Sequence, residues 1–211
     1  MRTLFFQAIS ELCGTAKIAF VIFNGLTALD FIGIYDPLTR LKRYGYIPDL
    51  TWEICSLTAE VRDDRNLQLL PTQVGGSLGA FDLLVVPGGD GTRSLQHDPE
   101  FIAWLQTAGP CPLKVSVCTG SLLLGAAGFL KGRPATTHPS AFDELRPYCE
   151  KVVDSRIVDT GDVITARGVT SSIDCGLYLV ERLAGVEARQ VISQKMDYPY
   201  SPPTDSLLRI G

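Results

Sequence analysis

The sequence predicts a single α/β domain built on a doubly wound, mostly parallel β-sheet that is sandwiched by helices. Its length of 211 residues is enough for one well-buried domain and short for two. Nearly continuous apolar runs at residues 17–23 and 81–86 have the length of strands buried on both faces of a parallel sheet. Segments with helical spacing alternate with such strands, which is typical of a doubly wound sheet.

The predicted elements follow one another from residue 17 onward. Strands are expected at residues 17–23, 52–58, 81–86 and 113–117, with a hairpin or edge strand at 61–70 and two short β runs between 152 and 165 that meet in a turn at 159–162. Helices are expected at 26–44, 98–108, from 120 to the break at 132–134, and at 139–145, 170–183 and 186–196. We interpret residues 1–15 as an N-terminal extension, residues 16–211 as the domain, and the proline-rich tail at 198–203 as an extended surface segment.

Charge and cysteine usage exclude several classes of function. The net charge of −4, with 19 scattered lysine and arginine residues, argues against a nucleic-acid partner. The six cysteines form no CxxC pair and only two histidines are present, so no metal site is expected. No apolar stretch has the length of a membrane helix, and the apolar run at the N-terminus is too short for a signal peptide. We therefore expect a reduced, cytoplasmic protein.

Cys118 lies where the pattern changes from a strand to a helix rich in small residues. A thiol at a helix N-terminus faces unpaired backbone N–H groups and the positive end of the helix dipole, so we expect its pKa to lie below the free value. The corner is similar to a nucleophile elbow, in which a tight turn presents a reactive side chain at the edge of a sheet. The alternative is that Cys118 is a small buried apolar residue, as most free cysteines are.

The loop at residues 88–92, Gly-Gly-Asp-Gly-Thr, follows the clearest predicted strand. This string also occurs in NAD kinases and diacylglycerol kinases, where glycine amides hold phosphate. Alternatively, Gly88 and Gly89 approach Cys118 and donate a backbone N–H to a developing negative charge, together with the N–H of Thr119. A glycine turn without further function is the third interpretation.

Two further side chains are candidates to act on Cys118. Asp30 lies in the first turn of the helix at 26–44, after the expected N-cap Thr27, and could hold or deliver a proton. It could also be only a charge favoured by the helix dipole. His138 would make a Cys-His hydrolase if it reached Cys118, but a histidine hydrogen-bonded at the start of a helix is favoured. Pro37 is expected to kink or divide the helix at 26–44.

Three segments resemble the ThiJ/PfpI superfamily: Phe-Asp-Leu-Leu-Val-Val-Pro-Gly-Gly-Asp-Gly at 81–91, Ser-Val-Cys-Thr-Gly-Ser-Leu-Leu-Leu-Gly at 116–125, and Arg-Pro-Ala-Thr-Thr-His at 133–138. The resemblance covers roughly residues 17–203. It implies a flavodoxin-like sandwich of the class I glutamine amidotransferase type, and a homodimer. Within the superfamily, the sequence is most similar to isonitrile hydratases and to the sensory domains of AraC-type regulators.

The resemblance also implies roles for individual residues. Cys118 aligns with the nucleophile, Asp30 with the essential carboxylate, Thr119 with the neighbouring hydroxyl, and Gly89 with the oxyanion-type amide. For an isonitrile hydratase, the thiolate attacks the isonitrile carbon, Asp30 moves the proton, and water releases an N-substituted formamide. This chemistry needs a small-molecule substrate and no cofactor. Thr119 stands where the protease branch carries a histidine, which argues against a peptidase.

Two alternatives stay open at this point. Arg167 stands where relatives carry small residues, and in the pocket it would favour an anionic or carbonyl substrate. It could instead be an exposed arginine. The alternative function is a non-enzymatic small-molecule or redox sensor of the AraC-regulator sensory type, since an exposed thiol of low pKa oxidises readily.

Overall fold

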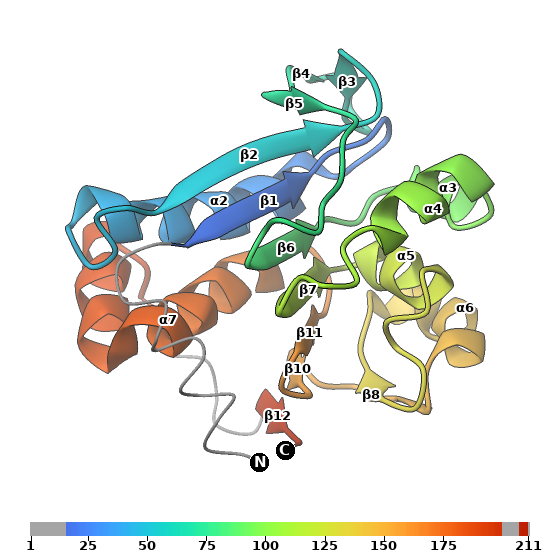
Figure 1. Cartoon of the computed structure of the whole chain (residues 1–211). Coiled ribbons are helices and arrows are strands. Elements are labelled where there is room, and N and C mark those ends of the chain that lie inside the picture. Colours follow the sequence, from blue (N-terminus) through green and yellow to red (C-terminus); the bar gives the residue numbers. More distant parts are fainter. Residues whose placement is uncertain (1–15, 200–206, 211) are drawn as a thin grey trace.

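An eight-stranded β-sheet forms the centre of the computed structural model, which describes residues 16–199 and 207–210 (Figure 1). Its strands lie in the order β12 (Leu207–Arg209), β10 (Ile157–Asp159), β11 (Val163–Ala166), β7 (Leu113–Val117), β6 (Leu83–Val86), β1 (Lys17–Val21), β2 (Thr51–Ser56) and β5 (Gln73–Val74). Neighbouring strands pair in parallel except β10 and β11, which are antiparallel. The predicted doubly wound, mostly parallel sheet is therefore confirmed.

Helices cover the sheet on both faces (Figure 1). One layer consists of α2 (Ala28–Arg43) and α7 (Ser171–Lys195), and the other of α3 (Thr92–Leu95), α4 (Pro99–Gln106), α5 (Gly120–Ala126) and α6 (Phe142–Leu145), with the 3-10 turns η1 (Pro139–Ala141) and η2 (Arg146–Tyr148). The strands β6 and β7 are buried along their whole length between these layers. The uniformly apolar composition of β6 follows from this double burial, whereas β7 also buries Lys114 and Ser116.

Two small β pairs lie outside the central sheet. The antiparallel pair β3 (Val61–Arg62) and β4 (Gln68–Leu69) forms the hairpin that was predicted at 61–70. A parallel pair, β8 (Pro134–Ala135) and β9 (Lys151–Val152), joins the segment before His138 to the segment before β10. Within the described residues, no helix combines the length and apolar character needed to cross a membrane.

A kink or a division of α2 is expected at Pro37, and the division is wrong, because α2 is one continuous helix with Pro37 inside it. The proline ring packs against α7, where a Cβ atom at Gly176 would lie 2.4 Å from Pro37 Cγ. Close packing of the two helices therefore offsets the backbone hydrogen bond that the proline removes. In contrast, Gly185 has a φ of +89° and interrupts α7, in agreement with the two helices predicted there.

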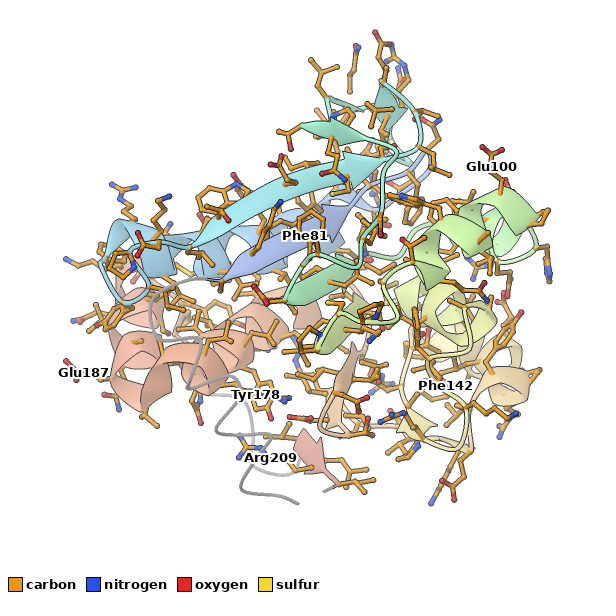
Figure 2. All side chains as sticks on the ribbon, in the orientation of Figure 1. Phe81, Glu100, Phe142, Tyr178, Glu187 and Arg209 are labelled. Carbon is orange, nitrogen blue, oxygen red and sulfur yellow. The ribbon has the colours of Figure 1, made fainter. Side chains whose placement is uncertain are left out.

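The strand β12 was not predicted; it pairs with β10 at the sheet edge, and a side-chain hydrogen bond joins it to α7. Arg209 Nε donates to the hydroxyl of Tyr178 at 3.0 Å, and Figure 2 shows the two side chains next to each other. Tyr178 in turn donates to Asp159, which also accepts from Arg182 at 2.9 Å.

The proposed extension at 1–15 and most of the proline-rich tail at 198–203 lie outside the described residues.

Candidate active site

Cys118 occupies the corner between β7 and α5 and has a φ of +53°, a conformation that costs energy for a residue with a side chain. Its N–H bonds to the carbonyls of Ala166 (3.0 Å) and Arg167 (2.9 Å). Its carbonyl accepts from the hydroxyls of Ser121 (3.2 Å) and Thr137 (2.9 Å). These bonds hold the strained backbone in place, and the predicted elbow at the end of the strand is confirmed.

The loop after β6 packs directly on this elbow. A Cβ atom at Gly88 would lie 2.5 Å from the backbone nitrogen of Thr119 and 2.8 Å from Cβ of Cys118. A Cβ atom at Gly120 would lie 2.3 Å from the carbonyl oxygen of Val86. Glycine is therefore required at both positions for the two strand ends to meet.

Asp30 is brought to the same edge of the sheet by α2, which follows β1. The strand β1 pairs with β6, and β6 pairs with β7, so the segments that leave these strands lie side by side. The Asp30 side chain is fully buried, and its Oδ2 accepts from the N–H of Gly88 at 3.0 Å. Its Oδ1 is also buried and has no hydrogen-bond partner of good geometry among the described residues. The carboxyl interacts with the Cys118 thiol, and each group shifts the pKa of the other.

Burial raises the pKa of both groups. Desolvation raises the pKa of Asp30 to about 7, against the opposing effects of the Gly88 N–H and the Cys118 thiol. Desolvation, and then the negative charge of Asp30, raise the pKa of Cys118 to about 12. The expected low thiol pKa is therefore wrong, because burial and the carboxylate outweigh the N–H of Thr119 at the start of α5. At neutral pH the pair consists of a neutral thiol beside a carboxyl group that is close to half ionised.

We expect the Asp30→Asn variant to react faster with iodoacetamide at Cys118 than the wild type does at pH 8 to 9. Removal of the carboxylate lowers the thiol pKa and increases the thiolate fraction, which is the reactive species. Alkylation rates measured by mass spectrometry of the Cys118 peptide test this. The other free thiols of the described residues, which serve as internal references, are Cys55, Cys111, Cys149 and Cys175. A slower reaction in Asp30→Asn would mean that the carboxylate promotes thiolate formation instead.

The amides of the glycine loop are engaged within the protein. The N–H of Gly89 donates to Thr119 Oγ1 at 3.0 Å, and the Gly89 carbonyl accepts from the hydroxyls of Thr119 (3.1 Å) and Thr92 (2.7 Å). The N–H of Gly88 donates to the Asp30 carboxyl, and the N–H of Gly91 donates to the carbonyl of Gly25 at 3.0 Å. This arrangement does not form a phosphate cradle. An oxyanion role for Gly89 stays a prediction, and it requires the amide to exchange its bond with Thr119.

The two remaining candidates lie beside the elbow with their side chains bound elsewhere. Arg167 contributes its carbonyl to the Cys118 N–H, but its guanidinium pairs with Asp154 at 2.8 Å and stacks over the ring of Phe142, which Figure 2 labels. A substrate contact by Arg167 stays a prediction. His138 bonds through Nδ1 to the hydroxyl of Ser140 at 2.8 Å and accepts from its N–H at the start of η1. The favoured interpretation of His138, a histidine that caps a helix start, is confirmed.

Sequence reasoning missed several supporting residues. Thr137 holds the Cys118 carbonyl, and Thr92 holds the Gly89 carbonyl. Thr137 stands next to His138 and Thr92 ends the Gly-Gly-Asp-Gly-Thr string, so both lie in segments that the sequence singles out. Nothing in the sequence indicates which carbonyl groups these hydroxyls hold. Among the described residues, no group of histidine, cysteine or acidic side chains has the arrangement of a metal site.

Comparisons with known proteins show the family of this chain. The sequence model of the DJ-1/PfpI family matches residues 16–182. An isonitrile hydratase from Pseudomonas putida is 35% identical over 195 residues, which cover 90% of this chain and 82% of that protein. DJ-1alpha from Drosophila melanogaster is 26% identical over 70% of this chain and 67% of its own. The crystal structure of a ThiJ/PfpI family protein from Pseudomonas syringae superimposes with a TM-score of 0.81 at 31% identity, covering 91% of this chain and 78% of that one. The chain belongs to the DJ-1/PfpI family.

Proposed function

We propose that this protein is a cofactor-independent hydratase that adds water to an isonitrile through the thiol of Cys118, with Asp30 as acid and base. The observation that carries this proposal is a buried thiol facing a buried carboxyl whose pKa is about 7. A general acid and base works best when its pKa lies near the working pH. The similarity to an isonitrile hydratase over most of both chains supports the choice of substrate class.

In the first half of the proposed reaction, the Asp30 carboxylate takes the thiol proton while the sulfur attacks the terminal carbon of the isonitrile. A sulfur–carbon bond forms, and the protonated Asp30 returns its proton to that same carbon. The product is a thioimidate in which Cys118 Sγ is bonded to a CH=N–R group. The N–H of Thr119 interacts with Sγ and stabilises negative charge on the sulfur during the attack.

In the second half, Asp30 takes a proton from water as the water oxygen attacks the thioimidate carbon. This proton passes to nitrogen. The sulfur–carbon bond then breaks as the hydroxyl proton of the adduct passes through Asp30 to the sulfur, which regenerates the thiol and releases R–NH–CHO. One water and one isonitrile are consumed for each formamide, and no oxidant or reductant takes part. The same carboxyl group therefore serves both halves of the cycle, which requires it to gain and lose a proton near neutral pH.

The thiol pKa also separates this proposal from its alternative. Oxidation of a cysteine to sulfenic acid proceeds through the thiolate, and a thiol with a pKa of about 12 holds little thiolate at neutral pH. A thiol that loses its proton to Asp30 during the attack on the substrate suits turnover better than it suits peroxide sensing. A Cys-His peptidase is disfavoured because His138 is bound to Ser140.

Formamide production from cyclohexyl isocyanide tests the proposed function. The wild type is expected to turn over, with kcat/KM rising with pH through about 7 as Asp30 ionises, and Cys118→Ser and Asp30→Asn are each expected to lose about 100-fold or more. Cys149→Ser and Asp90→Asn are matched controls, since Cys149 is another free thiol and Asp90 lies in the glycine loop with a largely exposed side chain. A folded wild type that alkylates at Cys118 but releases no formamide would overturn the isonitrile assignment.

A further inference from the structure

The N-terminus of α2 lacks the side-chain cap that its sequence predicts. Thr27 has the extended backbone of an N-cap residue, with φ −88° and ψ 111°, but its hydroxyl makes no hydrogen bond to the first turn of the helix. The hydroxyl donates instead to Oδ2 of Asp64 at 2.8 Å. Thr27 therefore departs from the usual N-cap hydrogen bond and binds a carboxylate that is distant in the sequence. Departures of this kind are expected at functional sites.

The turn between β3 and β4 is fastened to the loop that leads into α2. Arg62 donates its N–H to the side chain of Asn24 at 2.9 Å and accepts from the N–H of Gly25 at 2.8 Å. The N–H of Asp64 donates to the carbonyl of Leu26 at 2.8 Å. These bonds and that of the Thr27 hydroxyl hold Asp64 at the start of α2, where the carbonyl of Thr27 accepts from the N–H of Asp30 at 3.0 Å.

Asp64 does not stand alone, because Arg65 Nη1 lies 2.6 Å from its Oδ1. The Asp64 side chain is 13% exposed, whereas that of Arg65 is 73% exposed. The Asp64 carboxylate is therefore largely buried, whereas the Arg65 side chain that pairs with it is largely exposed to solvent. A change at either residue leaves the charge of the other without its counterpart.

We propose that Asp64, held by the Thr27 hydroxyl, and its ion-pair partner Arg65 are positioning residues for Asp30, and that their opposite charges act on the Asp30 carboxyl with opposite sign. For its catalytic consequence, this inference rests on the proposed function. Among the described residues, the titratable and charged side chains that interact with Asp30 are Cys118 from the elbow, and Asp64 and Arg65 from the turn between β3 and β4. Asp64 raises the pKa of Asp30 and Arg65 lowers it, after the larger effects of burial, the Gly88 N–H and the Cys118 thiol.

Titration of the Asp30 carboxyl carbon by NMR, in protein labelled with ¹³C-aspartate, tests the proposal without turnover. The Asp30 signal is assigned from its loss in Asp30→Asn. In Asp64→Asn the titration midpoint is expected to move to lower pH, because the neighbouring negative charge is gone while Arg65 stays. In Arg65→Gln the midpoint is expected to move to higher pH. Asn at position 64 can still accept the bond from Thr27, and Arg65 is exposed, so both variants should fold.

The ion pair of Asp36 and Arg40 offers a matched control on the same helix. Asp36→Asn and Arg40→Gln should leave the Asp30 midpoint unchanged, and the double variant Asp64→Asn/Arg65→Gln should bring it back toward the wild-type value. Shifts of the two single variants in the same direction, or no shift in either, would overturn the proposal. Opposite shifts without formamide production would uphold the charge pair and remove only the isonitrile assignment.

Discussion

The Gly120→Ala variant is expected to be less stable than the wild type by about 4 kcal/mol or more. Destabilisation of this size is exceptional for a single substitution and indicates a specific cause such as severe steric conflict. The added Cβ would lie 2.3 Å from the carbonyl oxygen of Val86 and 2.6 Å from that of Pro87. Both are backbone atoms of the loop that leaves β6, so no side chain can turn away to make room. Relief of the conflict has to separate α5 from β6, and with it the elbow from the loop of Gly88. Urea unfolding monitored by tryptophan fluorescence measures the change.

Gly109 provides the control for this substitution. Its φ lies outside the left-handed region, and the nearest atom to an added Cβ is the carbonyl oxygen of Gln106 at 3.4 Å. Gly109→Ala should therefore change the unfolding free energy by no more than about 0.5 kcal/mol. Equal effects of Gly120→Ala and Gly109→Ala would show that the elbow and the loop after β6 are not in contact.

The sequence was sufficient for the elements that carry their own hydrophobic pattern. β1 and β6 are nearly continuous apolar runs because both faces of each strand are covered, and α4 begins where Asp98 and Pro99 predict it. The strands β5 and β12 and the helix α3 were not predicted. Each spans no more than four residues, too few to show a period, and each depends on its neighbours in the fold.

For the candidate site, too, features set by nearby residues could be predicted and features set by residues distant in the sequence could not. Cys118 and Asp30 could be placed because a strand end and a helix start determine which edge of the sheet they reach. The thiol pKa could not be predicted, since it depends on burial and on a carboxylate that is distant in the sequence. The bond between Thr27 and Asp64 spans 37 residues, and no pattern in the sequence connects the two.

Asp30→Asn is expected to stabilise the protein at pH 8 and to leave its stability nearly unchanged at pH 4. Burial raises the pKa of the folded-state Asp30 from 3.8 to about 7, so between these pH values the folded protein holds a proton that the unfolded chain has lost. The wild type therefore loses stability relative to the variant as the pH rises through this window, by up to about 4 kcal/mol at about 1.4 kcal/mol per pKa unit. Urea unfolding at pH 4, 6 and 8 measures the difference.

The direction of this effect bears directly on the role of Asp30 as a base. A buried carboxyl that is costly to ionise is a group whose proton can be given up and recovered near neutral pH, and the loss of stability is the thermodynamic counterpart of that property. Asp90→Asn, in which an exposed carboxyl is replaced, should show no such dependence on pH. If the stability gap between wild type and Asp30→Asn stays constant from pH 4 to pH 8, Asp30 ionises in the folded protein as it does in the unfolded chain. It would then be a permanent carboxylate that cannot return a proton to the isonitrile carbon, and the acid half of its proposed role would be lost.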